Sequence, residues 1–279
     1  AIKPIGELGF FGTVVPEKYG GEDMGWLAAM IVTEEIAKAS RSLRVQVNMQ
    51  CIGSAYTIYK YGNENLRKKY IEKLVKADYL GGFAITEPDA GSDVAALKTF
   101  AKKDGDSYIL SGSKTFITNG TQADFLTLLA RTSEEKGYHS FSLFVVPTNL
   151  PGFNVSKKLD KMGMRSSDTA ELYFDDMRIP AENLIGVEGE GFIHQMMQFQ
   201  HERYAVLPLT YISAKEIIDE TVEYLKGRIV FGKPLIKKQV LRHRLVEWLS
   251  EIECLKQLTY HIVRMKMAGQ DVSKEISMG

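Results

Sequence analysis

The sequence has few cysteines and no excess of charge of either sign. Cys51 and Cys254 are the only cysteines among 279 residues, and neither has a second Cys or a His at a metal-ligand spacing. A disulfide framework and a zinc site are therefore not expected. The 35 Lys and Arg residues balance the 35 Asp and Glu residues, so nothing favours binding to phosphate backbones. We expect no metal and no nucleic acid partner.

Long apolar runs are also lacking. The longest uncharged runs, such as 141–150, fall far short of the roughly 20 apolar residues that a membrane-spanning helix needs. No basic and then apolar leader opens the chain. These patterns predict no membrane partner and an intracellular, reducing compartment. The chain begins with Ala1 rather than Met, and Gly279 directly follows a helical pattern, so we expect truncation at both ends.

What is present describes an ordinary soluble globular protein, with 44% hydrophobic, 25% charged and 10% aromatic residues. The length allows one large domain or two to three of modest size. In residues 1–82 the apolar residues recur at helical spacing, most clearly in 26–39 and 65–76. This periodicity predicts helices that pack one face against a core.

Residues 83–186 change to short runs rich in β-branched and aromatic residues. Turn clusters at 103–106, 119–120 and 147–152 separate these runs. No helical crossover interrupts them, which argues against a Rossmann unit and favours an antiparallel β-domain. The runs are 108–110, 114–118, 125–130, 141–146 and 170–174.

Residues 187–279 become helical again after the glycine-rich turn 186–191. Apolar residues alternate in steps of four and three from Leu241 to Ile262, which is typical of a left-handed helix bundle. Few helices of comparable length are visible, so missing chain or a second subunit is expected to supply partners. The predicted fold class is α+β, with an N-terminal helical domain (1–82), a central antiparallel β-domain (83–186) and a C-terminal helical bundle domain (187–279).

Four segments carry groups that could meet a ligand, and each also has a purely structural interpretation. The loop 86–93 offers small hydroxyls and backbone amides to a polar ligand, or is a plain turn. Segment 115–120 sets an aromatic residue beside threonines, as a flat cofactor or a β-hairpin requires. Glu202, between a His and an Arg, is a general base or a member of a surface ion-pair cluster. Segment 227–235 holds a phosphate through its arginine, or simply joins two helices.

The order of the motifs is more specific than any one of them. A helical segment precedes Ile-Thr-Glu-Pro-Asp-Ala-Gly-Ser-Asp (85–93), Phe-Ile-Thr-Asn-Gly (116–120) and Met-Arg-Ser-Ser-Asp-Thr (164–169). A Glu-Arg pair and Arg-x-x-Phe-Gly-x-Pro-Leu (228–235) with a following Gln complete the series. Over essentially its whole length the chain resembles the acyl-CoA dehydrogenase flavoprotein family. The resemblance implies that FAD and an acyl-CoA thioester are held between the three domains.

The resemblance also assigns binding residues. Phe116 stands where the family commonly has a Trp, which keeps an aromatic surface but removes an indole N–H. Ser92 is implied near the thioester as well, and Gln200 and Arg203 border the substrate path. The implied FAD contacts are Phe83, Ile85, Thr86, Gly91, Ser92, Phe116, Ile117 and Thr118, with Arg228, Phe231 and Gln239 contacting the FAD of a neighbouring subunit. Those last contacts imply a homo-oligomer, either a tetramer or a dimer.

The resemblance leaves two positions for the catalytic base, because family members place this glutamate at one of two points in the sequence. One lies beyond Gly279, and the other, typical of branched-chain and long-chain members, falls on Glu202. We expect Glu202 to be the base, and a glutamate beyond Gly279 stays open. The acyl group itself is not fixed by the sequence.

The implied activity is that of an FAD-dependent oxidoreductase of fatty acid or amino acid catabolism. It would convert an acyl-CoA to a trans-2-enoyl-CoA by α-proton abstraction and β-hydride transfer to flavin N5. An electron-transferring flavoprotein is the implied partner, and a bacterial cytoplasm or a mitochondrial matrix the implied location. Two alternatives stay open: a family relative acting as an oxidase, monooxygenase or enoyl-CoA reductase, and a catalytically silent scaffold of the same fold.

Overall fold

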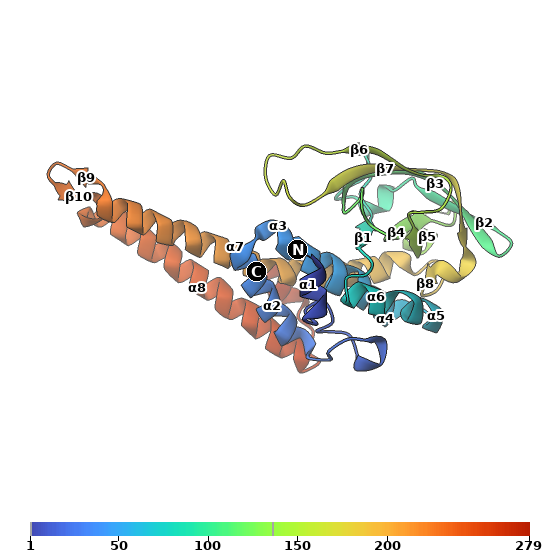
Figure 1. Cartoon of the computed structure of the whole chain (residues 1–279), viewed down its shortest axis with the longest axis horizontal. Coiled ribbons are helices and arrows are strands. Elements are labelled where there is room, and N and C mark those ends of the chain that lie inside the picture. The colour runs from blue at the N-terminus through green and yellow to red at the C-terminus, as the bar shows by residue number, and fades with distance from the viewer. Residues whose placement is uncertain (1, 136) are drawn as a thin grey trace. The chain divides into compact units, whose positions relative to one another are not determined.

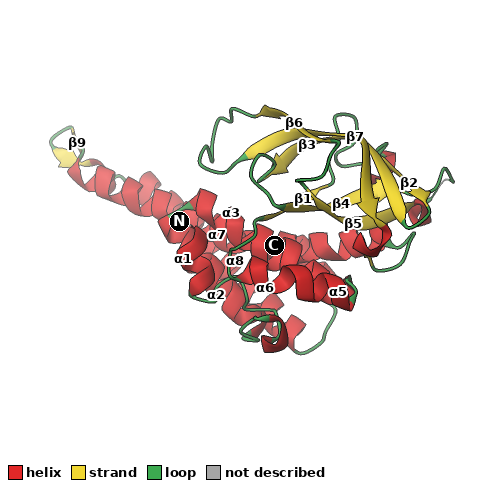
Figure 2. Ribbon diagram, turned by 45° about the vertical axis from the view of Figure 1, so that its right-hand side comes forward, coloured by secondary structure: helices red, strands yellow, loops and turns green. Residues whose placement is uncertain are grey.

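The protein is described by a computed structural model that covers residues 2–135 and 137–279. Helices come first, then a β-sheet, then helices again, in the order predicted from the sequence (Figures 1 and 2). By internal contacts the chain forms two compact units. The first unit holds the residues up to Gly25 together with Val45–Glu202, and the second holds Trp26–Arg44 and Arg203–Gly279.

The N-terminal region is helical where apolar periodicity predicted helices. The segment 26–39 lies in α2 (Gly25–Ala39), and three consecutive helical stretches cover the predicted segment 65–76 as far as Val75. The Asn63 side chain begins the latter by accepting a hydrogen bond from the Leu66 amide at 2.9 Å. The other helices here are α1 (Ile2–Glu7), α3 (Arg41–Val47), the π-helix η2 (Asn48–Ala55), α4 (Tyr56–Tyr61), α5 (Glu64–Leu66), the π-helix η3 (Arg67–Ile71) and α6 (Glu72–Val75), with a 3₁₀ turn η1 (Glu17–Tyr19).

An eight-stranded sheet follows, in the order β6-β7-β3-β2-β4-β5-β8, with β1 paired to β4. Neighbours in this order are antiparallel except for a single parallel pair of residues between β2 and β4, and β1 is parallel to β4. The strands are β1 (Gly81–Ala84), β2 (Phe100–Asp104), β3 (Ser107–Thr118), β4 (Phe125–Arg131), β5 (Phe141–Pro147), β6 (Phe153–Lys158), β7 (Thr169–Pro180) and β8 (Leu184–Ile185).

The sheet differs in detail from the runs read in the sequence. The runs 108–110 and 114–118 are one strand, β3, whose register against β7 shifts twice, between Leu110 and Gly112 and between Lys114 and Ile117. Strands β2 and β6 carry many charged residues and gave no apolar signal. Strands β4 and β5 are buried along almost their whole length, and Tyr108, Leu128 and Phe144 are among the buried residues of the core that they share.

The second unit is built from long helices. Residues 203–227 of α7 (Gly191–Gly227) run beside α8 (Gln239–Met267), as both views show (Figures 1 and 2). The predicted helix across 241–262 is therefore confirmed, and Ile218 and Leu225 of α7 pack with Leu245 of α8. The turn between α7 and α8 contains β9 (Ile229–Val230), β10 (Lys233–Pro234) and the 3₁₀ turn η7 (Leu235–Lys237), and α9 (Ser273–Met278) follows α8.

A buried carboxylate ties three helices of the second unit together. Glu34 of α2 is 7% exposed and accepts hydrogen bonds from the hydroxyls of Tyr211 of α7, at 3.0 Å, and Tyr260 of α8, at 2.6 Å. The Lys256 ammonium lies 3.8 Å from the other oxygen. Because a buried charge needs such partners, Glu34 requires the three helices to keep this arrangement.

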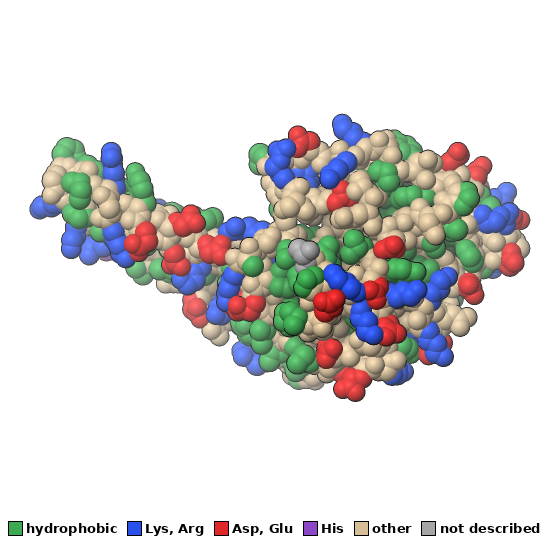
Figure 3. All heavy atoms as spheres, in the orientation of Figure 1, with side chains coloured by type: hydrophobic (Ala, Val, Ile, Leu, Met, Phe, Trp, Pro, Cys, Tyr) green, Lys and Arg blue, Asp and Glu red, His purple; other side chains and the backbone are tan. Residues whose placement is uncertain are grey.

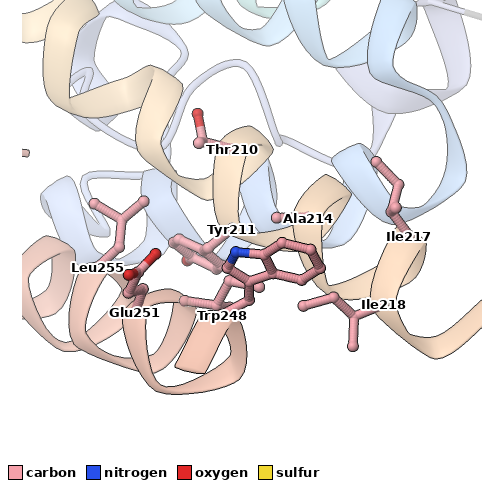
Figure 4. Close-up of a pocket in the computed structure, with 9 residues that line it drawn as sticks. Thr210, Tyr211, Ala214, Ile217, Ile218, Trp248, Glu251 and Leu255 are labelled. Atoms are coloured by element: carbon pink, nitrogen blue, oxygen red, sulfur yellow. The ribbon is translucent and has the colours of Figure 1, made fainter. Parts of the chain in front are cut away.

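An apolar groove of about 410 Å³ runs between α7 and α8. Figure 4 shows the Trp248 indole lying beside Tyr211 and Ile218. None of the residues predicted to bind cofactor or substrate lines it. Elsewhere on the visible face, charged side chains of both signs are interspersed (Figure 3). Among the described residues, no helix combines the length and apolar character needed to cross a membrane.

Candidate functional site

The loop after β1 is the first part of the candidate site. Phe83 is half-buried on β1 and faces η2, where a side-chain carbon at Gly53 would come within 2.6 Å of its ring. Gly53 is therefore needed for the helix to approach the strand. Beyond β1, Ile85 is buried, Thr86 is half-buried, and Gly91 and Ser92 are exposed with open space around Gly91. The loop thus offers small groups to a ligand.

Strand β3 brings the second predicted segment to the first. The Thr115 amide donates to the Thr86 carbonyl at 2.9 Å, which joins the two segments. The register shift that follows puts Phe116 in the left-handed region, at φ 59°, and leaves its ring 67% exposed. Its neighbour Ile117 points into the core and is 2% exposed, and Thr118 is half-buried. A bulge of this kind re-aims a side chain away from the sheet.

A buried ion pair lies beneath these segments. The Lys114 ammonium is fully buried and donates to the Ile85 carbonyl at 2.9 Å, to Glu87 Oε1 at 2.9 Å and to the Leu129 carbonyl at 2.8 Å. Glu87 in turn accepts from two backbone amides of the chain that follows the loop, those of Lys98 at 2.7 Å and Thr99 at 3.0 Å. The pair fixes both ends of the loop to β3.

Burial shifts the ionisation of this pair. Loss of water lowers the pKa of Lys114 to about 8, although the Glu87 charge and hydrogen bond oppose that shift. For Glu87 burial acts against the charge, but the Lys114 charge and the hydrogen bonds from Thr99, Lys98 and Lys114 outweigh it and lower the pKa of the carboxyl. Glu87 is therefore ionised at neutral pH.

Three side-chain amides attach the helices to the same region. Gln46 and Asn119 exchange hydrogen bonds of 2.7 and 2.9 Å, and Asn119 also donates to the Gly81 carbonyl at 2.9 Å. Gln50, one helical turn after Gln46, accepts from the Gly81 amide at 2.7 Å. Asn119 is fully buried with φ 64°, a conformation that Asn tolerates better than most residues. Both the amide and the carbonyl group of Gly81 are thus held.

These features suit a flat heterocyclic ligand such as a flavin. An aromatic ring left 67% exposed on a well-anchored strand offers a flat apolar surface on which a ring system can stack. Thr86, which is joined to that strand, and Thr118, which ends it, are half-buried residues that carry hydroxyls, and the space around Gly91 is open. The arrangement combines a stacking surface with small hydrogen-bonding groups, as a ring system with polar edges requires.

Glu202 lies on α7 in the same unit. Its carboxylate is half-buried and accepts a hydrogen bond from the Gln198 amide one turn earlier. The neighbouring His201 is buried, with its ring edge-to-face on Tyr56 of α4 at 5.1 Å between centroids. Gln200 is half-buried on the same helix. The interpretation of the Glu-Arg motif as part of a surface ion-pair cluster stays an alternative prediction.

The remaining predicted residues belong to the second unit. Arg203 is exposed on α7. Arg228, Phe231 and Gln239 lie in and next to the turn between α7 and α8, and all three are exposed. Phe231 is 91% exposed at φ 51°, so this turn also presents an aromatic ring from a left-handed residue.

Sequence reasoning missed the residues that hold the site in place. Lys114 and Glu87 were read as members of motifs and not as an ion pair, and Gln198 was not singled out. A signal existed for Lys114, which is a charged residue directly before β-branched and aromatic residues in a strand. No local pattern distinguishes Gln46, Gln50 or Gln198 from ordinary surface glutamines, because burial is decided by contacts with distant segments.

Comparison with known proteins matches all three parts of the chain. Family models for the acyl-CoA dehydrogenase N-terminal, middle and C-terminal domains match residues 1–78, 82–177 and 189–279. A glutaryl-CoA dehydrogenase from Desulfococcus multivorans is 45% identical over 273 residues, covering 97% of this chain and 70% of the relative.

Solved structures of similar proteins have the same fold as this chain. The structure of a glutaryl-CoA dehydrogenase in complex with glutaryl-CoA has a TM-score of 0.91 at 45% identity, covering 95% of this chain and 68% of that one. The FAD complex of PigA has a TM-score of 0.94 at 29% identity, covering 99% of this chain and 73% of that one. The predicted order of helical, β and helical parts is the fold that these neighbours share.

Proposed function

The chain belongs to the acyl-CoA dehydrogenase family, whose members are FAD-dependent oxidoreductases, and we propose that it converts an acyl-CoA thioester to a trans-2-enoyl-CoA. One observation carries the proposal. The first unit contains both an exposed Phe116 set beside the 83–92 loop and, on α7, the half-buried carboxylate of Glu202. A stacking surface and a base are the two parts that the reaction requires from the protein.

The cofactor is assigned to the two joined segments. FAD is held by residues of 83–92 and 116–118, with Phe116 against the ring system and the Thr86 and Thr118 hydroxyls available to its polar edge. What FAD supplies when bound is an acceptor, flavin N5, for the hydrogen that leaves the β-carbon with its electron pair. Arg228, Phe231 and Gln239 are assigned to the FAD of a second copy, so the active form is a homo-oligomer, either a tetramer or a dimer.

The protein's own part is removal of the α-proton. The Glu202 carboxylate takes that proton, and the electron pair of the broken C–H bond enters the new double bond between the α- and β-carbons. Ser92, Gln200 and Arg203 are assigned to the thioester and the path of the pantetheine arm. An electron-transferring flavoprotein is the proposed electron acceptor. The division of the chain into three domains, 1–82, 83–186 and 187–279, is part of the same proposal.

The direct test is the visible spectrum of the purified protein during anaerobic addition of acyl-CoAs. A panel of glutaryl-CoA, butyryl-CoA and isovaleryl-CoA covers dicarboxylic, straight and branched chains. We expect an oxidised flavin band that one member bleaches, with formation of the enoyl-CoA product. A flavin band that no acyl-CoA bleaches would indicate a reductase or a monooxygenase, and purification without flavin would indicate a silent scaffold.

Glu202→Gln tests the assignment of the base. We expect the variant to keep its flavin and to lose turnover by about 100- to 10,000-fold, the usual contribution of a general base. Glu220→Gln is the matched control, because Glu220 is an exposed glutamate on the same helix. Retention of most of the turnover in Glu202→Gln would place the base elsewhere.

A further inference from the structure

Two buried glutamines precede Glu202 on one face of α7. Gln195 is 1% exposed and Gln198 is 3% exposed. The Gln195 amide nitrogen donates to the Gln198 amide oxygen, and the Gln198 amide nitrogen donates to Glu202 Oε1. Positions three and four apart share a helix face, so the three side chains form a continuous line of hydrogen bonds.

The direction of these hydrogen bonds follows from the chemistry of the end group. An ionised carboxylate can only accept, so the Gln198 nitrogen must face Glu202 and its oxygen must face away. The oxygen then needs a donor, because a buried amide without partners costs free energy, and Gln195 supplies it. The hydrogen bond from Gln198 is strongest when Glu202 carries its charge, because an ionised carboxylate is a better acceptor than a protonated one.

We propose that Gln195 and Gln198 act as a hydrogen-bonded relay that fixes the rotamer of Glu202 and keeps its carboxylate ionised, ready to accept a proton. The inference rests on the proposed function in one respect, that Glu202 is the base. Neither glutamine touches a reacting atom in this scheme, so both are positioning residues. The Gln198 hydrogen bond is charge-assisted and favours the ionised form of Glu202, and Gln195 strengthens it by polarising the Gln198 amide.

Other titratable groups surround this stretch of α7 and bear on any titration. Glu190, His194 and His201 lie on α7 or next to its start, and α4 contributes Tyr56 and Tyr61. Burial lowers the pKa of His194, which stacks on Tyr61, while Glu190 opposes that shift. Arg203 follows Glu202 directly. The test therefore needs a signal that belongs to Glu202 alone.

The test substitutes each of the two glutamines by methionine in the purified flavoprotein. Gln198→Met keeps the length of the side chain and removes the donor, and Gln195→Met removes the outer member. The matched control is Gln257→Met, because Gln257 donates at 2.7 Å to Glu253, also four residues away, on an exposed part of α8. Infrared difference spectra over a pH series, with the Glu202→Gln spectrum subtracted, give the ionisation midpoint of Glu202.

Loss of a hydrogen bond to the charged form moves the midpoint to higher pH. We expect a rise of about one pH unit in Gln198→Met, a smaller rise in Gln195→Met and none in Gln257→Met. The acid limb of the kcat profile should move with it. Unchanged midpoints in Gln198→Met and Gln195→Met would overturn the relay. If Gln198→Met does not fold, Gln195→Met decides alone.

The two proposals fail separately. If Glu202→Gln retains turnover, Glu202 is not the base and the proposed function loses its catalytic residue. The infrared midpoints still report whether Gln198 and Gln195 hold the Glu202 carboxylate in its ionised form.

Discussion

Lys114 carries a charge into the interior of the β-sheet, where three oxygen atoms replace its hydration. Two of these oxygens are main-chain carbonyls, and the third belongs to Glu87. Breaking such a pair by removing one partner usually costs about 3–5 kcal/mol, because the other charge stays buried without compensation. The pair therefore limits what can be substituted beneath the loop that we assign to FAD.

Substitution of Lys114 should change how stability depends on pH. The pKa of Lys114 is about 8 in the folded protein and is depressed below its ordinary value of 10.5, so between these values the unfolded chain binds more protons. The free energy of unfolding of the wild type should then rise with pH relative to Lys114→Met, by up to about 1.4 kcal/mol per pH unit. Urea unfolding of both proteins from pH 7 to 10.5 measures this difference.

The double variant Lys114→Met/Glu87→Gln supplies the control. It removes both charges, so it should be more stable at pH 7 than Lys114→Met alone. A stability difference between wild type and Lys114→Met that stays constant from pH 8 to 10.5 would contradict the ionisation behaviour described for Lys114.

At the scale of elements, the bulge in β3 does most to form the candidate site. It allows Ile117 to remain in the core while Phe116, the residue before it, turns outward. A left-handed conformation costs a non-glycine residue about 1–2 kcal/mol. The fold tolerates that cost at Phe116 because the neighbouring residues of β3 are paired on both sides of the bulge.

Phe116→Gly separates the role of the ring from the stability of the strand. Glycine adopts the left-handed conformation freely, so the variant should unfold at the same denaturant concentration as the wild type or a higher one. Flavin binding should weaken by about 10-fold or more, because the aromatic contact is lost. Titration of the apoprotein with FAD, followed by flavin fluorescence, measures the affinity.

Tyr173→Ala is the control for Phe116→Gly. Tyr173 is another partly exposed aromatic residue, on the neighbouring strand β7, and is not assigned to the flavin. Its loss should leave FAD affinity unchanged. Equal FAD affinity in Phe116→Gly and the wild type would remove Phe116 from the cofactor site.

The elements differ in how far the sequence predicts them. Helices such as α2 and α8 and strands such as β4 and β5 follow from periodicity or from continuous apolar runs, because one face or both faces are buried. Strand β6 cannot be predicted in this way, because it is in the sheet through its pairing with β7 and its own composition gives no signal. The bulge is equally hidden, because it depends on the register against β7.

At the scale of the whole molecule, contacts regroup segments that are far apart in the chain. Residues 26–44 belong to the same compact unit as 203–279, although about 160 residues separate them. Apolar periodicity predicts α2 as a helix but cannot name its partners. The buried Glu34 is the clearest sign of the regrouping, since its hydrogen-bond donors come from positions 211 and 260.

Glu34→Gln should weaken the second unit. The amide carries no charge, so the two tyrosine hydrogen bonds lose their charge assistance and Lys256 loses its partner, and we expect a loss of about 1–3 kcal/mol in the free energy of unfolding. Burial and then the Glu34 hydrogen bond and charge raise the pKa of Tyr260 to about 12, so that pKa should also fall in the variant. Thermal unfolding and ultraviolet titration of tyrosine measure the two effects.

Glu35→Gln is the adjacent control, because Glu35 is exposed and pairs at 2.5 Å with the exposed Lys38. It should leave the unfolding temperature unchanged and lower the pKa of Tyr260 less than Glu34→Gln does, because Glu35 acts on Tyr260 through its charge alone and makes the smallest contribution to the shift. If Glu34→Gln were as stable as the wild type, the hydroxyls of Tyr211 and Tyr260 would have to find other hydrogen-bond acceptors.

The hydrogen bond between Gln50 and the Gly81 amide has a consequence for the order in which the chain is made. Gln50 and Gly81 are 31 residues apart, whereas the strand partner of Gly81, at Phe125, is synthesised 44 residues later still. A nascent chain that has reached β1 already contains the glutamine that holds it, but no part of β4. The N-terminal helices can therefore bind β1 and hold it in place until β4 has been synthesised and can pair with it.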